Sequence, residues 1–112
     1  LKIIDRASVD INPLNPVDRL DYSRLLSYTW ADQCARLDHI KQIAPHQTIM
    51  VEQTDAVDWL PNRLSKQRIG TLHFVFHTIA LQYFPQESKD KIAHALSQAG
   101  KRATPERPLG YI

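Results

Sequence analysis

Short apolar runs alternate along this sequence with stretches whose apolar residues recur at helical spacing. The runs cover residues 3–11, 48–51 and 72–77, and each is bounded by turn-forming or polar residues, so each predicts a strand. Strands that alternate with helices are joined by crossover connections, which place neighbouring strands parallel. The pattern therefore predicts an α/β fold, in which helices flank a doubly wound, mostly parallel sheet.

The three runs differ in what they predict. Residues 3–11 lead into the turn-rich segment 12–16, as a strand leaving a sheet would. Residues 48–51 are an unbroken apolar run, which is typical of a strand buried on both faces. Residues 72–77 are aromatic and β-branched, so we expect them at the centre of the sheet. A possible last strand begins after Pro108.

Four stretches predict helices. Asp18 is placed to start the first, whose stripe would comprise Tyr22, Leu25, Leu26, Thr29 and Trp30. The second carries Leu37, Ile40 and Ala44 on one face and must end near Pro45, because the residue before proline is pushed out of the helical region.

Asp55 is placed to cap the third helix, which has Val57, Leu60 and Leu64 on its buried stripe. Pro61 predicts a kink or a break there, because it lacks a backbone donor. The fourth helix has Pro85 in its first turn and Gly100 at its close, with an apolar stripe of Ile92, Ala95, Leu96 and Ala99.

Composition narrows the class of protein. The 112 residues are 43% hydrophobic and 23% charged, which predicts one ordinary globular domain over residues 1–112. The 14 Lys and Arg residues against 12 Asp and Glu leave +2, and they are scattered, so we expect no nucleic-acid partner. No apolar run approaches the roughly 20 residues that span a bilayer, so we expect no membrane association. A single cysteine, Cys34, fits a reducing, cytoplasmic compartment.

Several kinds of site are disfavoured. The three glycines are isolated, so the sequence has neither a P-loop nor a dinucleotide-binding glycine motif. His73 and His77 would lie about 13 Å apart on one strand, which is too far for one metal ion. Nothing near Cys34 suggests a thiolate nucleophile, because His39 follows it at a spacing that points the two side chains apart. We expect no metal site.

In an open parallel sheet, ligands bind beyond the carboxyl ends of the strands. This rule nominates Asp10 and Asn12 after the first strand and Asp55 after the second, with Glu52 nearby. Each has a simpler alternative. Asp55 is placed to cap a helix and could also bind a ligand, while Asp10 and Asn12 could merely shape the turn before proline.

The same rule nominates His77, Gln82 and Tyr83 after the third strand. A histidine at the end of an apolar strand is well placed for proton transfer, although it could instead be hydrogen-bonded to a loop carbonyl. Tyr83 could be a packed aromatic residue whose hydroxyl reaches water. We take His77 and Tyr83 as candidate catalytic residues and Asp10, Asn12 and Asp55 as candidate cofactor-binding residues.

Specific strings carry a family resemblance. They are Val9-Asp10-Ile11-Asn12-Pro13-Leu14, Trp30-Ala31-Asp32-Gln33 with Arg36, Thr54 to Leu60, Val75-Phe76-His77-Thr78 with Gln82-Tyr83, and Ala103 to Leu109. In this order they resemble a bacterial family, domain of unknown function 2332. The sequence departs from the family pattern at Ala31, where proline is usual, at Ser8, where glycine is usual, and at Asn15, where aspartate is common.

The resemblance implies a Rossmann-like fold similar to class I methyltransferases. Members are longer, so the chain would be the C-terminal half of a larger protein, consistent with ends that look cut; the isolated half would be inactive. In the full-length parent, S-adenosylmethionine is a possible cofactor, with Asp55 near the adenine and His77 to Tyr83 in the catalytic or substrate-facing loop. The missing glycine-rich strand would lie between two strands present here, so either the sheet is rearranged, or its exposed strand edges meet the missing N-terminal half or a second copy. A noncatalytic protein-interaction module is the alternative.

Overall fold

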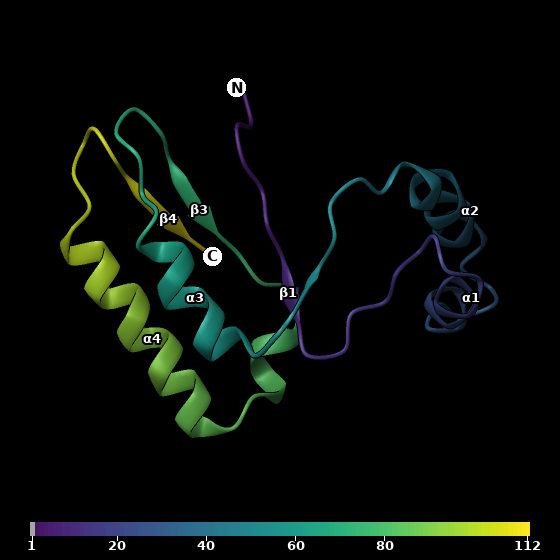
Figure 1. Ribbon diagram of the computed structural model, residues 1–112. Helices are drawn as coiled ribbons and strands as arrows, with labels where there is room; N and C mark the ends of the chain where they lie inside the picture. Colours follow the sequence, from purple (N-terminus) through teal and green to yellow (C-terminus); the bar gives the residue numbers. More distant parts are fainter. Residues whose placement is uncertain (1) are drawn as a thin grey trace. The chain divides into compact units, whose positions relative to one another are not determined.

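The computed structural model describes residues 2–112 and divides the chain into two compact units, the first ending at Thr54 and the second spanning Asp55–Ile112 (Figure 1). Each unit contains one two-stranded parallel sheet. The mixed α/β class is thus confirmed at this level, with a few short parallel strands and helices. No helix within residues 2–112 is long and apolar enough to cross a membrane.

The first unit pairs β1 (Val9–Asp10) with β2 (Glu52–Gln53) in parallel. The backbone N–H of Glu52 donates to the Ser8 carbonyl at 2.9 Å, and that of Thr54 donates to the Asp10 carbonyl at 3.1 Å. The predicted strand over 3–11 is therefore confirmed only at its end. The prediction of a doubly buried strand over 48–51 is wrong, because the ladder forms one step later, at two exposed residues.

Between these strands lie α1 (Arg19–Ser27), α2 (Cys34–Ile43) and the 3-10 turn η1 (Ala44–His46). Asp18 caps α1 as predicted, since its carboxylate accepts from the backbone N–H groups of Leu20 and Asp21 at 2.9 and 3.0 Å. The predicted extension to Trp30 is wrong, because the backbone N–H of Thr29 turns back to the Leu26 carbonyl, three residues earlier, and closes the helix. Trp30 is 77% exposed.

The second unit contains α3 (Ala56–Leu64), β3 (His73–Val75), the 3-10 turn η2 (Ala80–Tyr83), α4 (Gln86–Lys101) and β4 (Leu109–Tyr111). The β3–β4 pair is parallel, with His73 opposite Leu109 and Val75 opposite Tyr111. The prediction that residues 72–77 form a central strand is wrong, because β3 has one neighbour in its sheet. The predicted last strand is confirmed as β4.

Two helix details also differ from expectation. α3 is unbroken at Pro61, so that residue costs one backbone hydrogen bond without ending the helix. Its neighbours Leu60 and Leu64 are both buried, and this packing favours the helix through the proline. Gly100 does not close α4, which runs on to Lys101, and its φ is not positive.

The core of the second unit lies between its helices and one face of its sheet (Figure 1). The buried residues of this cluster are Leu60, Leu64, Ile92 and Ala99. Val75 and Leu109 pack against them from the two strands. The apolar stripes predicted for α3 and α4 are thus the surfaces that these helices bury.

Candidate functional site

His77 and Tyr111 meet at the carboxyl ends of β3 and β4. The register that places Val75 opposite Tyr111 continues beyond the strands, because the backbone N–H of Ile112 donates to the Val75 carbonyl and that of His77 donates to the Ile112 carbonyl, both at 3.2 Å. This ladder holds His77 Nε2 at 3.0 Å from the Tyr111 hydroxyl oxygen. The two ring centroids are 5.8 Å apart, at 49°.

The partners of the imidazole assign its neutral tautomer. His77 Nδ1 lies 3.2 Å from the carbonyl oxygen of Thr78, which can only accept, so Nδ1 carries the hydrogen. Nε2 then has the lone pair and accepts from the Tyr111 hydroxyl. The phenolic oxygen keeps lone pairs for a further donor. This arrangement can pass a proton from a bound group through Tyr111 to His77.

The bond to Thr78 is the loop-carbonyl contact that the sequence offered as the simpler interpretation of His77. It is compatible with a proton-transfer role, since it fixes the ring and leaves Nε2 free of a proton. Sequence reasoning missed Tyr111. The signal for it was the same rule that nominated His77, applied to the end of the last predicted strand.

Tyr83, the other candidate catalytic residue, ends η2 and has 78% of its surface exposed. The preceding residue, Gln82, accepts a hydrogen bond at its carbonyl from Lys89 Nζ at 3.0 Å. The described second unit therefore brings Tyr111 into contact with His77, and places Tyr83 on the surface. It does not show Tyr83 packed as a buried aromatic residue.

Asp10 and Asn12 lie at the carboxyl end of β1 in the first unit. The backbone N–H of Asn12 donates to Asp10 Oδ1 at 2.8 Å, which closes a local turn before Pro13. Gln53 Nε2, on the neighbouring strand, donates to the Ile11 carbonyl at 3.4 Å. The turn-shaping interpretation of Asp10 is thus what these contacts support directly, and both nominated side chains remain exposed.

Asp55 opens the second unit as the N-cap of α3. Its Oδ1 accepts from the backbone N–H of Val57 at 2.8 Å, and its backbone is extended, as a cap requires. The capping prediction is confirmed, and the exposed carboxylate keeps one oxygen for another donor.

Glu87, Lys91 and Glu106, three ionisable groups of the second unit, have shifted pKa values. Lys91 Nζ is 2.6 Å from Glu87 Oε1 on α4; this hydrogen bond, and then the attraction between the charges, lowers the pKa of Glu87 and raises that of Lys91. A hydrogen bond with the Thr104 side chain lowers the pKa of Glu106. All three groups are fully exposed, so they influence local stability rather than building a site.

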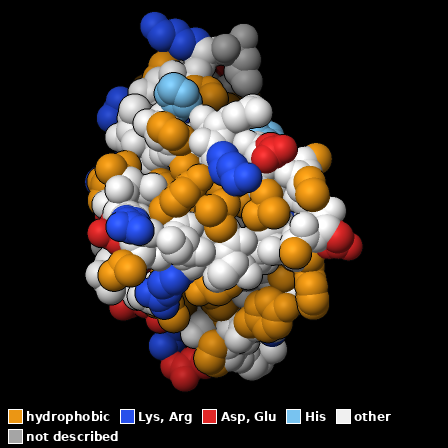
Figure 2. Space-filling view, turned by 90° about the vertical axis from the view of Figure 1, so that its right-hand side faces the viewer, with side chains coloured by type: hydrophobic (Ala, Val, Ile, Leu, Met, Phe, Trp, Pro, Cys, Tyr) orange, Lys and Arg blue, Asp and Glu red, His pale blue; other side chains and the backbone are white. Residues whose placement is uncertain are grey.

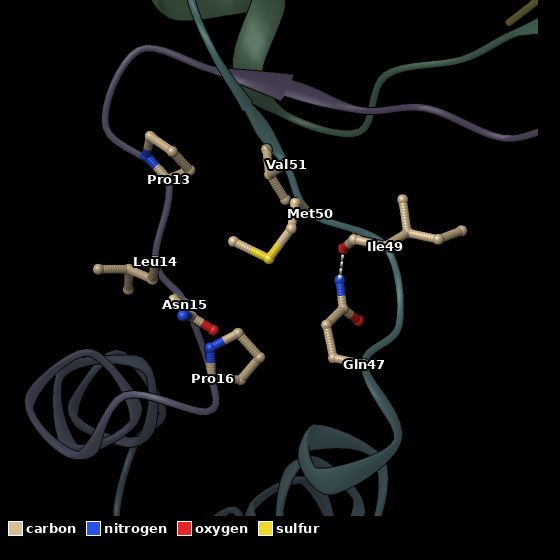
Figure 3. Close-up of a pocket in the computed structure, with 8 residues that line it drawn as sticks. All are labelled: Pro13, Leu14, Asn15, Pro16, Gln47, Ile49, Met50 and Val51. Carbon is tan, nitrogen blue, oxygen red and sulfur yellow. Dashed lines mark hydrogen bonds between the residues drawn. The ribbon is translucent and has the colours of Figure 1, made fainter.

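A small cavity of about 60 Å³ lies in the first unit, between the segment after β1 and the segment before β2 (Figure 3). Its walls are Pro13, Leu14, Asn15, Pro16, Gln47, Ile49, Met50 and Val51. Met50 points into the space, whereas Ile49 points away and its carbonyl accepts from Gln47 Nε2 at 2.6 Å. Asn15 Oδ1 accepts from the Val17 backbone N–H at 3.1 Å. Because these polar groups are engaged locally, the cavity offers mainly apolar contacts.

Two other kinds of site, a metal centre and a reactive cysteine, can be compared with the structure. Across residues 2–112, no three His, Cys, Asp or Glu side chains lie together as a metal site would need. Cys34 is exposed at the start of α2, with its sulfur 3.8 Å from the Ala31 carbonyl oxygen.

A comparison with protein-family models gives a match over residues 1–112 to a family described as "Uncharacterized protein conserved in bacteria (DUF2332)". No curated protein and no solved structure matches the chain.

Proposed function

This chain belongs to the DUF2332 family of proteins conserved in bacteria, and we propose that it forms the C-terminal half of a methyltransferase-like domain in which His77 and Tyr111 handle a proton. In this proposal residues 1–112 belong to one Rossmann-like domain, which is completed by an N-terminal half that binds the cofactor through a glycine-rich turn. The chain alone is inactive.

The observation that carries the proposal is the 3.0 Å contact between His77 Nε2 and the Tyr111 hydroxyl at the carboxyl ends of two parallel strands. That edge is where open parallel sheets bind their ligands. A hydroxyl or amine of a substrate would donate to the Tyr111 oxygen. As that group loses its proton to Tyr111, the phenolic proton moves to Nε2, and the Thr78 carbonyl continues to hold Nδ1–H of the imidazolium.

Two of the candidate cofactor-binding residues can still accept a hydrogen bond from a polar ligand. Asp10 and Asp55 each use Oδ1 for a local backbone bond, so each exposed carboxylate can offer Oδ2 to an amino or hydroxyl group. S-adenosylmethionine, bound in the full-length parent, would supply the methyl group from its sulfonium. Asn12 remains a candidate cofactor-binding residue in the first unit, and Tyr83, exposed on η2, a candidate substrate-facing residue in the second.

The test is a calorimetric titration of S-adenosylmethionine into the full-length parent and into this chain. The informative substitution is Asp55→Asn, which keeps a capping oxygen and removes the charge. Asp18→Asn is the matched control, because Asp18 caps α1 through the same kind of bond. We expect saturable binding to the parent, weakened about tenfold by Asp55→Asn and unchanged by Asp18→Asn, as loss of one charged hydrogen bond implies. A folded parent that does not bind would refute the cofactor assignment.

The proton pair has a separate test. Nitrogen-15 spectra of the imidazole should show Nδ1 protonated and Nε2 hydrogen-bonded in the neutral ring. Tyr111→Phe should move the Nε2 signal toward that of a free ring nitrogen and leave Nδ1 unchanged. A neutral ring protonated at Nε2 would contradict the proposed direction of proton transfer, whatever the cofactor result.

A noncatalytic protein-interaction module, built on the same fold, is the second candidate. The observation in its favour is the number of large apolar side chains that reach solvent, seen in orange among lysine and arginine side chains in Figure 2. Met50, for instance, is 68% exposed beside the small cavity of the first unit. Failure to bind S-adenosylmethionine together with a defined protein partner would favour this candidate.

A further inference from the structure

The β3–β4 sheet buries one face and leaves the other open. Side chains at alternate positions of a strand point to opposite faces. Val75 and Leu109 pack on the core formed with α3 and α4, so the alternating set belongs to the opposite face. That set, which we call the open face, comprises Leu72, Phe74, Phe76, Gly110 and Ile112.

The side chains of the open face are all apolar, and none of them is charged. Phe74 and Phe76 stack with their ring centroids 6.3 Å apart. A Cβ on Gly110 would lie 2.6 Å from Phe74 Cδ2, so the absence of that atom lets the Phe74 ring lie directly against β4. The exposed fractions are nevertheless 56% for Leu72, 53% for Phe74, 67% for Phe76 and 73% for Ile112.

The size of the open face decides between possible occupants. An aromatic side chain has a surface of roughly 200 Å², so the exposed fractions of Phe74 and Phe76 together correspond to roughly 240 Å² of exposed surface. Adding the exposed surface of Leu72 and Ile112 brings the exposed area of the open face to roughly 450 Å². A stable complex of two folded proteins buries about 800 Å² on each partner. A second copy of the chain packed on this face alone would therefore bury about half of what a stable dimer needs.

A single helix fits these dimensions. From Leu72 to Phe76 the strand covers about 13 Å, close to two and a half helical turns, and two strands about 4.8 Å apart with their side chains match a helix about 10 Å wide. Parallel sheets are covered by helices on both faces, and here α3 and α4 cover one. We propose that the open face is a docking surface for an amphipathic α-helix whose contacting stripe is aliphatic and uncharged.

The docking surface is distinct from the His77–Tyr111 pair. His77 is two residues after Val75 and Tyr111 two residues after Leu109, so by strand alternation both side chains belong to the helix-covered side of the sheet. They lie at the carboxyl end of the sheet. The proposed helix therefore does not depend on the proposed methyltransferase-like function.

The probe is a synthetic helical peptide of about 18 residues, with leucine at positions spaced i, i+3, i+4 and i+7 and lysine or glutamate elsewhere. It is titrated into the nitrogen-15-labelled chain. We expect saturable shifts at the amides of the open face, and none from a peptide of the same composition whose leucines form no stripe. Shifts confined to α1 or α2 would overturn the proposal.

Charge-introducing variants sharpen the test. Phe76→Asp and Ile112→Asp, both at exposed positions, should each weaken peptide binding about tenfold or more, since an aromatic or aliphatic anchor is replaced by a charge. Trp30→Asp is the control, because Trp30 is at least as exposed as these two residues and lies in the first unit. Unchanged binding in folded Phe76→Asp and Ile112→Asp would refute the surface. A dimer in sedimentation that Phe76→Asp abolishes would overturn the helix in favour of a second copy.

Discussion

Gly110→Ala tests the packing of the open face most directly. The added Cβ would lie 2.6 Å from Phe74 Cδ2, 3.0 Å from Phe74 Cε2 and 3.7 Å from Leu72 Cδ1. The first distance is shorter than carbon atoms allow and the second is tight, so the Phe74 ring must move. Because that ring is 53% exposed, it can turn outward without disturbing the backbone.

The free energies can be compared. An off-rotamer ring costs about 0.5–1.5 kcal/mol, and a lost aromatic pair with Phe76 costs about 0.5–1.5 kcal/mol. Alanine in place of glycine inside a strand returns about 0.5–1 kcal/mol. We therefore expect Gly110→Ala to lower the free energy of unfolding by up to about 2.5 kcal/mol, centred near about 1 kcal/mol, as the difference between these effects.

The effect of Gly110→Ala on the free energy of unfolding should change sign when the Phe74 ring is removed. In a Phe74→Ala background nothing opposes the new Cβ, so Gly110→Ala should stabilise the unit by about 0.5 kcal/mol through its backbone effect alone. The free energies of unfolding of the starting protein, the two single variants and the double variant can be measured by urea denaturation followed by Trp59 fluorescence. Trp30→Phe in all four removes the signal of the first unit. Equal effects of Gly110→Ala in both backgrounds, or stabilisation of the protein that retains Phe74, would refute the packing argument.

Three further predictions concern the second unit. Leu64→Ala should lower its free energy of unfolding by about 2–5 kcal/mol, because Leu64 is 1% exposed, while exposed Leu20→Ala should change stability by less than about 0.5 kcal/mol in denaturant titrations. Gln67→Met should stabilise by about 1 kcal/mol, since the buried Gln67 Nε2 has no hydrogen-bond partner among the described residues; destabilisation would indicate a hidden partner. The lowered pKa of Glu87 means that its pairing with Lys91 stabilises above the carboxylate's unfolded pKa and is lost as pH falls through its folded value, so Glu87→Gln should flatten this acid-side dependence in melting curves.

The helices were predictable because their signals are local. Asp18 and Asp55 each accept a hydrogen bond from a backbone donor within three residues, so a short stretch of sequence contains the whole interaction. Pro45 lies within η1, directly after the end of α2, for an equally local reason. Where the local signals misled, at Pro61 and Gly100, packing of the same helix faces extended the helices beyond the expected limits.

The strands were less predictable because pairing depends on residues far away in the sequence. The apolar run at 48–51 is a strong local signal, yet the ladder forms at Glu52, whose partner Val9 lies 43 residues earlier by the register. For the same reason, sequence reasoning missed Tyr111 as a residue of the candidate site. Its contact with His77 spans 34 residues and exists because β3 and β4 pair in one particular register. A shift of that register by one residue would send the Tyr111 side chain to the open face and separate the pair. The register that Gly110 and Phe74 help to fix is therefore also what builds the candidate site, and a Gly110 variant that altered pairing would change the imidazole spectrum as well as stability.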